Sequence, residues 1–336
     1  MSSPTREIGG YFELEPGSDR LGTDAPHLGP DAVRLNSGRN ALRAALMASG
    51  AKRIHLPDYL CESVVQTVRM AGVEPVFHHL DDQLQPAVDI ACDQDELWLS
   101  VNYFGLMDAA MSEAAHQTDR LVVDNCQAFY AAPLAGVINL YSPRKFFGVP
   151  DGGYVVGIAA GDWSSDNSQD RMKHLFLRAE QGAEAGYAAF QDHEQIFADL
   201  PVRSMSPLTQ TLLATVDYAA AAEQRLENYR LLNDKLGADN QLSIAVNHDG
   251  NGVPLVYPFV NEAEGLRAKL HRHDIFAASY WPGCLQRPEC GRQARNLARN
   301  LTALPIDQRY NAQDMDQIAR AVREHLAGNR VRLVVS

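Results

Sequence analysis

The chain has 336 residues, of which 46% are hydrophobic and 21% are charged, and its formal net charge is -12. This length allows one large and one small domain, while the acidic balance disfavours nucleic acid and anionic membranes as partners. The five cysteines form no CxxC pair, the N-terminal stretch lacks a signal-peptide core, and no apolar run reaches the ~20 residues that span a bilayer, so we expect a cytoplasmic protein.

The first part of the chain, residues 1–31, is rich in Gly, Pro and Asp and predicts an irregular arm that packs on the body or on a partner subunit. Residues 32–236 begin with short apolar runs that alternate with amphipathic stretches, which is typical of an α/β domain with a largely parallel sheet. The expected strands are residues 53–57, 73–80, 96–104, 121–125, 136–142 and 152–160, and the expected helices are residues 41–48, 62–70 and 108–117.

The region from residue 170 to residue 236 is mostly helical in pattern, with one long helix expected over residues 208–236. Strand, helix and strand patterns return in residues 237–336, which predicts a small C-terminal α/β domain. Its expected elements are strands at 253–260 and 274–282, a helix at 264–273 and a last helix at 312–326.

A lysine just after the expected strand at 136–142 is the first candidate for chemistry. Ser142 and Lys145 form an S-x-x-K pattern in YSPRKFFGVPDGGY, before a Gly-rich turn. A lysine that is desolvated at the mouth of a sheet can lose its proton and attack a carbonyl carbon, and the Ser142 hydroxyl could bind a phosphate. The alternative is a solvated lysine beside Arg144, because S-x-x-K also occurs on surface helices.

Two further segments carry an acid and a helix start. Asp124 follows an apolar run, and in open α/β sheets ligands bind beyond the carboxyl ends of the strands. A carboxylate there can hold a proton on a pyridine nitrogen, although an Asp that caps a helix or turn explains the position equally well. Ser37, Gly38 and Arg39 open an Ala- and Leu-rich helix, whose first N–H groups favour a phosphate or form an ordinary capped start.

The order of these three segments resembles that of fold type I aminotransferases, and most closely the DegT/DnrJ/StrS-type sugar aminotransferase family. The resemblance covers residues 35–325. The family's S-G-T-x-A-L helix start is similar to NSGRNALRAAL, its H-L-Y-G to VNYFG, and its D-x-A-Q/H-A to VDNCQA. Its lysine with a following G-E-G-G-like turn is similar to RKFFGVPDGG.

The resemblance implies a fold type I transferase of the α/β class with pyridoxal 5'-phosphate (PLP) as cofactor. Such a protein has a large domain, with a mainly parallel sheet sandwiched by helices, and a small C-terminal α/β domain. Lys145 would bond to the cofactor, Asp124 would face its pyridine nitrogen and Gln127 its ring hydroxyl, while Ser142 and residues 37–39 would hold its phosphate. The family also implies a homodimer with shared active sites.

Several positions depart from the family pattern. Leu140 replaces the common serine five residues before the lysine, so Ser142 is the candidate for that phosphate contact. Cys61 stands where an aromatic residue stacks on the ring, and Tyr59 is the alternative stacking residue. The family's N-Y-R-M-S segment, which enters the neighbouring subunit's site, is echoed by VRSMS, in which Arg203 is the substitute for the missing asparagine.

Candidates for substrate contact are Asn102 and Tyr103 in VNYFG, Trp281 in SYWP, and Arg309 and Tyr310 in PIDQRY. Arginine pairs bidentately with carboxylate or phosphate, although ordinary domain packing explains the last three residues equally well. No metal site is expected, because the histidines at 78–79 and at 271 and 273 have no third ligand at a sensible spacing.

The expected activity is transfer of an amino group from an amino-acid donor, for which glutamate is the family's usual choice, to a small keto substrate such as a keto-sugar or nucleotide-sugar. Two alternatives stay open: a PLP-dependent sugar dehydratase, and a non-catalytic regulatory or binding relative on the same fold. Lys145 favours transamination, because the dehydratase branch of the family tends to have histidine there. Lys145 together with Asp124 disfavours a regulator.

Overall fold

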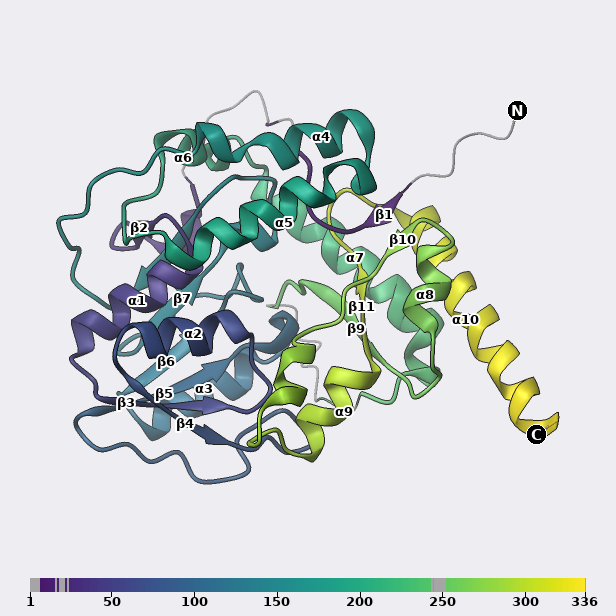
Figure 1. Ribbon diagram of the computed structural model, residues 1–336, viewed down its shortest axis with the longest axis horizontal. Helices are drawn as coiled ribbons and strands as arrows, with labels where there is room; N and C mark the ends of the chain where they lie inside the picture. The colour runs from purple at the N-terminus through teal and green to yellow at the C-terminus, as the bar shows by residue number, and fades with distance from the viewer. Residues whose placement is uncertain are drawn as a thin grey trace.

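The computed structural model describes residues 7–15, 17, 22, 24–242, 244 and 252–335, with the backbone alone for residues 329–335. The rest of the expected N-terminal arm, residues 1–6, 16, 18–21 and 23, lies outside the described residues. Figure 1 shows a larger part built around one sheet, with the green and yellow C-terminal elements grouped beside it.

Seven strands form the sheet of the larger part: β2 (Val33–Leu35), β3 (Arg53–Pro57), β4 (Glu74–His78), β5 (Glu96–Val101), β6 (Leu121–Asp124), β7 (Ile138–Tyr141) and β8 (Gly153–Val156). Their order is β2-β8-β7-β6-β5-β3-β4. The strands from β7 to β4 run parallel, whereas β8 is antiparallel to both of its neighbours. Every residue of β5 is buried, as expected for a strand that is covered on both faces.

Helices α1 (Gly38–Ser49), α2 (Glu62–Met70) and α3 (Asp108–Gln117) cover this sheet. α2 joins β3 to β4, whereas α3 joins β5 to β6 and so leads towards the opposite edge. Because such crossovers are right-handed, the two helices lie on opposite faces, and Figure 1 shows α1 and α2 together in front of the sheet. The predicted sandwich of a mainly parallel sheet between helices is confirmed.

The ends of α1 follow from its sequence. Oγ of Ser37 accepts the N–H of Asn40 at 3.0 Å, which is the usual N-cap contact of serine. Gly50 ends the helix with φ at 64°, a left-handed conformation that costs glycine no steric strain. Ser37 also bridges Gly152, the residue before β8, so the start of α1 lies beside the edge of the sheet.

Four helices fill the stretch after the sheet: α4 (Lys173–Gln181), α5 (Ala183–Asp199), α6 (Pro207–Ala214) and α7 (Tyr218–Leu236). The expected continuous helix over residues 208–236 is wrong, because the chain breaks between α6 and α7. Asp217 starts α7 anew by accepting the N–H of Ala220 at 3.0 Å. α4 and α5 pack against each other and lie along the top of the view in Figure 1.

The smaller part contains the antiparallel pair β9 (Val256–Val260) and β11 (Leu301–Pro305), and the helices α8 (Leu266–His271), α9 (Arg292–Asn300) and α10 (Ala312–Val335). α10 is longer than the expected helix at 312–326, and α9 was not predicted. The two-residue strands β1 (Ile8–Gly9) and β10 (Ile275–Phe276) pair in parallel and join the N-terminal segment to this part. Short 3-10 helices are η1 (Pro26–Leu28), η2 (Tyr103–Gly105), η3 (Pro143–Lys145), η4 (Gln169–Arg171), η5 (Gly237–Asp239) and η6 (Pro282–Gln286).

Two groups of buried hydrophobic residues form the core. The larger surrounds the central sheet, and the smaller lies between β9, β11 and α10, with Phe259, Leu304 and Ile318 fully buried. Within the described stretches, none of the helices combines the length and the apolar character that a membrane crossing requires.

Candidate active site

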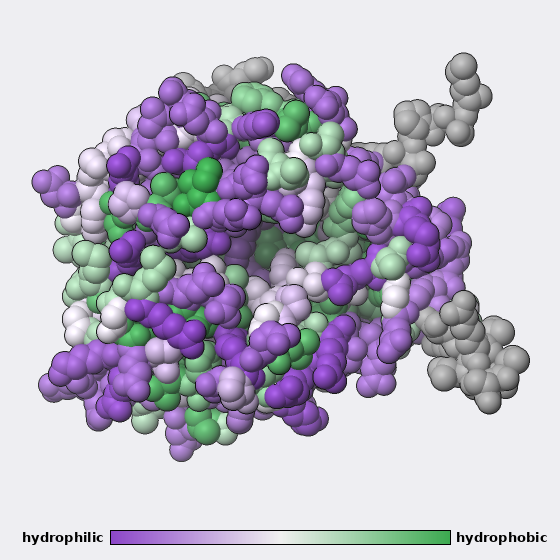
Figure 2. Space-filling view, in the orientation of Figure 1, coloured by the Kyte–Doolittle hydropathy of each residue, from purple (hydrophilic) through white to green (hydrophobic). Residues whose placement is uncertain are grey.

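A cavity of about 390 Å³ lies where β6 and β7 end and α1 begins. Figure 2 shows this face of the molecule hollowed near its centre, with hydrophobic residues inside the hollow. The predicted residues that line the cavity are Ser37, Gly38, Arg39, Cys61, Asp124, Gln127, Ser142, Lys145 and Trp281. Residues from five separate segments therefore meet at the edge of the sheet where α/β proteins bind ligands.

Lys145 ends η3, the short turn that follows β7. It lines this first cavity and also a second one of about 830 Å³, which extends towards β10 and α8. No hydrogen bond or ion pair engages its side chain within the described part of the chain. Lys145 thus stands where the two cavities meet, and it is exposed, so the desolvation expected from the sequence is not found.

Asp124 ends β6 and is 7% exposed. Its Oδ1 accepts the backbone N–H of Cys126 at 2.9 Å, and the Cys126 thiol lies against the same carboxylate. Burial, and then the charge of Asp124, raise the pKa of the Cys126 thiol well above its usual value, whereas Lys145 opposes the shift. The Cys126 side chain therefore lies within electrostatic reach of both the acid and the amine and stays a neutral thiol.

Gln127 is buried, and its Oε1 accepts the backbone N–H of Phe104 at 2.9 Å. This contact fixes the side-chain amide, so that Nε2 is the group left to donate to a ligand.

The start of α1 forms one wall of the cavity. A Cβ at Gly38 would lie 3.4 Å from both Cβ of Ser142 and Sγ of Cys126, so the helix start and the S-x-x-K serine are in close contact. The first N–H groups of a helix have no partner inside it and attract anions. Residues 37–39 and Ser142 therefore lie together at one wall of the cavity, and their binding of a phosphate stays a prediction.

Helix α5 supplies a part of the wall that the sequence did not predict. Glu194 pairs with Arg144 and lies 3.5 Å from Arg39, and all three line the cavity. Burial opposes ionisation of Glu194, but Arg144 and then Arg39 hold its pKa below the usual value. The wall beside the phosphate cradle is thus a carboxylate shared by two guanidinium groups.

Tyr59 does not line the cavity, which corrects its expected stacking role. It is fully buried, its ring packs 4.8 Å from that of Trp281, and its hydroxyl donates to the carbonyl oxygen of Tyr280 at 3.2 Å. Cys61 lines the cavity instead.

Asn102 and Tyr103 are also buried away from both cavities, so they do not form the expected substrate wall. Asn102 donates to Asn125 at 3.0 Å and accepts from the N–H of Met107 at 3.0 Å. The Tyr103 hydroxyl donates to the carbonyl oxygen of Tyr59 at 2.7 Å. Both side chains stabilise the turn after β5.

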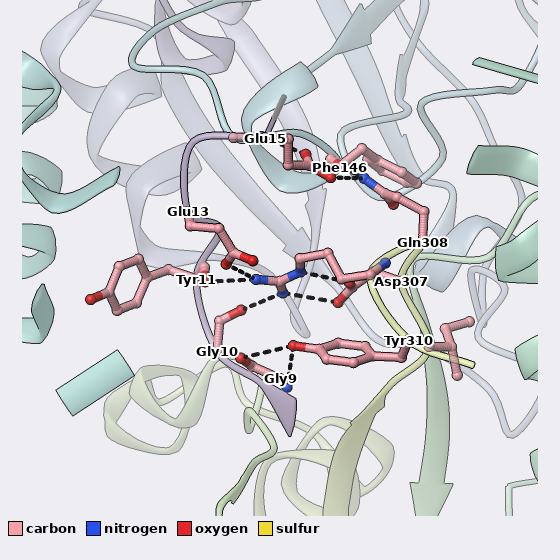
Figure 3. Close-up of polar contacts among 12 residues, drawn as sticks. Gly9, Gly10, Tyr11, Glu13, Glu15, Phe146, Asp307, Gln308 and Tyr310 are labelled. Carbon is pink, nitrogen blue, oxygen red and sulfur yellow. Dashed lines mark hydrogen bonds and ion pairs between the residues drawn. The ribbon is translucent and has the colours of Figure 1, made fainter. Parts of the chain in front are cut away.

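Arg309 and Tyr310 hold the N-terminal segment and do not line either of these cavities (Figure 3). Arg309 pairs with Asp307 and with Glu13, and Tyr310 accepts the N–H of Gly9 at 2.7 Å. The alternative of domain packing therefore describes these two residues better than substrate contact.

Arg203 and the histidines at 78–79, which the sequence analysis considered as possible site residues, have partners within the chain. Arg203 lies 3.6 Å from Asp166 within the chain. His78 stacks on Trp98 with ring centroids 4.5 Å apart, and His79 lies 2.9 Å from Asp58.

The cavities are also lined by residues that the sequence analysis did not name. Cys126 lies inside the VDNCQA segment and could have been inferred from it, whereas α5 matches no motif. Tyr11 and Phe12 line both cavities although they belong to the expected irregular arm.

No model of a protein family matches the sequence, and no curated protein is similar to it by sequence. Solved structures share its fold. The aminotransferase TlmJ from Streptoalloteichus hindustanus is similar over 91% of this chain and 89% of its own, with a TM-score of 0.65 and 15% identity. DesV from S. venezuelae, solved in complex with a ketimine intermediate, is similar over 94% and 90%, with a TM-score of 0.64 and 20% identity.

A DegT DnrJ EryC1 StrS aminotransferase from Brucella abortus is similar over 87% of this chain and 85% of its own, with a TM-score of 0.56 and 16% identity. At such identities the likeness establishes the fold. The resemblance expected from the sequence, to fold type I enzymes of this family, is confirmed at that level.

Proposed function

We propose that this chain is a PLP-dependent aminotransferase, which moves an amino group from an amino-acid donor, glutamate, to a keto-sugar or nucleotide-sugar. The observation that carries the proposal is the single cavity that holds the Lys145 amine, the Asp124 carboxylate and the start of α1. An amine, an acid and an anion cradle are the three groups that such a cofactor needs from a protein. The shared fold with aminotransferases supports the same assignment.

The residues present fit pyridoxal phosphate. A cavity of about 390 Å³ falls in the size range of cofactor sites. Residues 37–39 and Ser142 would hold the phosphate, Asp124 would accept a hydrogen bond from the protonated ring nitrogen, and Gln127 would donate to the ring hydroxyl. The bound cofactor would supply an electron sink for the charge left when a C–H bond of the donor breaks.

The protein's own part in the chemistry centres on Lys145. Its Nζ would hold the cofactor, and once the donor has displaced it, the free amine would act as general base on the proton of the donor's α-carbon and then as general acid. Asp124 would keep the ring nitrogen protonated, because a carboxylate accepts a hydrogen bond from that nitrogen. Cys126 adds no charge between the two groups, because its thiol stays neutral.

The test is a titration of the purified chain with PLP, followed by borohydride reduction and peptide mass mapping. A mass increase on the peptide that contains Lys145 is expected, and Lys145→Ala should abolish both this label and any turnover with glutamate. Lys52→Ala is the matched control, because Lys52 pairs with Asp95 at the surface, and Lys52 lines neither cavity. Labelling elsewhere, or turnover in Lys145→Ala, would contradict the proposal.

The same experiment separates the alternatives. Loss of absorbance of the loaded protein on addition of glutamate supports transamination. A loaded protein that ignores amino donors would indicate a dehydratase, and a chain that cannot be loaded would indicate a regulator.

The proposal includes a homodimer with shared active sites. Large apolar side chains are exposed on neighbouring helices, and a second copy of the chain is the occupant that would cover them: Met47 on α1, Phe176 on α4, Tyr187 and Ile196 on α5, and Leu208 on α6. Light scattering on the purified protein should give twice the mass of the chain, and a monomer at working concentration would contradict this part.

A further inference from the structure

The segment Gly10–Phe12 lines both cavities on either side of Lys145. The rest of the larger cavity comes mainly from β10, α8 and α5, and this segment is part of the wall that the two cavities share, together with Phe190, Leu255 and Tyr280. A stretch without recognisable pattern in the sequence therefore shares both cavities with the proposed reactive lysine.

Two buried arginines, neither of which lines the two cavities, hold this segment, and Figure 3 shows where Glu13 and Tyr310 lie beside it. Arg309, with 8% of its side chain exposed, donates to Oε2 of Glu13 at 2.6 Å and to the carbonyl oxygen of Tyr11 at 3.2 Å. Arg178, with 5% exposed, donates to the same carboxylate oxygen at 3.0 Å and to the carbonyl oxygen of Gly9 at 2.7 Å. Glu13 is thus the carboxylate on which both guanidinium groups converge.

The segment is anchored at both ends. On the small-domain side, the N–H of Gly9 donates to the Tyr310 hydroxyl at 2.7 Å, and the N–H of Gly10 donates to Phe276 at 3.0 Å. On the large-domain side, Glu15 accepts the N–H of Gly148 at 3.0 Å, just after the Lys145 turn. The segment therefore ties the small domain to the loop that carries the lysine.

The ring of Tyr11 is fixed against α5. It stacks on Phe190 with centroids 4.7 Å apart and planes at 13°, and its hydroxyl donates to Ala183 at 2.9 Å. A Cβ at Gly186 would lie 2.1 Å from that hydroxyl oxygen, so α5 needs glycine there for Tyr11 to fit.

We propose that Tyr11 and Phe12 form the acceptor-facing wall of the site, and that Arg309 and Glu13 are positioning residues that hold this wall in place. The inference rests on the proposed function and adds a determinant of acceptor choice. Aromatic faces at this wall suit a ring that presents a face of C–H groups, as a sugar ring does. The wall excludes bulkier groups from Lys145 as long as the arginines hold it.

The first experiment measures, without cofactor, how firmly Arg309 holds the N-terminal segment. Hydrogen–deuterium exchange of the peptide that spans residues 7–15 is compared between the wild type, Arg309→Met and Arg292→Met. Exchange at Gly9 and Gly10 should quicken about tenfold or more in Arg309→Met, because loss of one partner of a buried ion pair favours local opening. Arg292→Met removes the same charge from an exposed pair and should change nothing. Unchanged exchange in Arg309→Met would overturn the positioning role.

The second experiment measures the wall in the PLP-loaded protein. Hydroxylamine and O-benzylhydroxylamine both strip such a cofactor by forming an oxime at the carbon bonded to Lys145, which releases the Nζ amine, but only the second reagent is bulky. The wild type should react much faster with the small reagent. Arg309→Met should raise the relative rate of the bulky reagent about tenfold, while Arg309→Lys, which keeps the charge, should raise it less.

A double-mutant cycle tests Tyr11 itself. Gly186→Ala, outside both cavities, should open the site to the bulky reagent by displacing the Tyr11 ring, and Tyr11→Phe should relieve most of the clash in the double variant. Equal rate ratios in all four proteins would overturn the wall. A wild type that does not retain PLP would instead contradict the proposed function, and the exchange experiment would still decide whether Arg309 positions the segment.

Discussion

Gly153 is the position at which one methyl group should do most harm to the proposed phosphate cradle. A Cβ there would lie 2.3 Å from the carbonyl carbon and oxygen of Ser37, and 2.7 Å from the amide nitrogen of Gly38. Ordinary contacts of a Cβ begin at 3.4 Å, so the methyl group needs roughly 1 Å more room, and packed interiors do not absorb such an overlap. The opposing atoms are backbone atoms, and therefore β8 and the start of α1 must separate.

The cost follows from this displacement. Overpacking of this kind lowers the free energy of unfolding by ~1–3 kcal/mol, and the upper end is expected because no side chain can rotate away. A shift of the helix start also loosens its grip on a phosphate. Loss of one hydrogen bond to a charged group is worth about 1.5–3 kcal/mol, which is roughly a ten- to hundredfold weaker affinity for PLP.

The assay compares Gly153→Ala with Gly328→Ala, where a Cβ meets nothing within 4 Å. Urea unfolding of the cofactor-free proteins gives the change in the free energy of unfolding, and a PLP titration followed by absorbance gives the change in affinity for PLP. Wild-type stability together with wild-type affinity in Gly153→Ala would refute the reasoning that the start of α1 touches the phosphate.

Three further outcomes are expected. Burial, and then the charge of Arg144, lower the pKa of His174 from 6.5 to about 4 and also lower the pKa of His193. As the pH drops, the unfolded chain therefore binds protons at these histidines before the folded chain does, and the free energy of unfolding should fall between pH 6.5 and pH 4. A free energy of unfolding in urea that stays constant over that range would contradict this. Asp124→Asn can still accept the N–H of Cys126 but carries no charge, so turnover should fall ~100-fold at an unchanged melting temperature, and turnover near the wild-type rate would contradict the role of the acid. Arg225 is fully buried and donates to the carbonyl oxygens of Leu255 and Phe146, so Arg225→Met should destabilise the chain by more than about 3 kcal/mol in urea unfolding, and a loss below about 1 kcal/mol would show that these carbonyls find other partners.

The central sheet could be predicted because its strands and helices carry local patterns. β5 is buried along its whole length, so its apolar run is continuous and visible in the sequence. The expected helices at 62–70 and 108–117 coincide with α2 and α3. Local composition is sufficient where each element buries one face or both in the same core.

Elements that depend on distant contacts could not be predicted in this way. β1 and β10 have two residues each, too few for any period, and they exist because they pair with each other. The break between α6 and α7 depends on Asp217, which caps one N–H group at the start of α7. The sequence did not indicate the break, because residues 208–236 contain neither Gly nor Pro.

The residues of the candidate site were predictable where they follow strand ends and were not predictable where distant packing brings them to the cavity. Asp124, Ser142 and Lys145 follow strand ends, so the parallel sheet gathers them at one edge. Arg309 was expected in the substrate wall, but an acid two residues earlier and Glu13 from the N-terminal segment bind its guanidinium instead. Glu194 and Tyr11 arrive from segments without motifs, and only the packing of α5 and the N-terminal segment brings them to the cavity.

The Gly9–Tyr310 hydrogen bond joins residues 301 positions apart, and this separation has a consequence for biosynthesis. On the ribosome, the acceptor-facing wall at Tyr11 and Phe12 is synthesised long before β10, Arg309 and Tyr310, which hold it. Contacts of such high sequence separation form late, after local ones. The cofactor half of the pocket can therefore assemble while translation continues, whereas the other half closes only after Arg309 and Tyr310 have left the ribosome, which delays selective access to Lys145 until then.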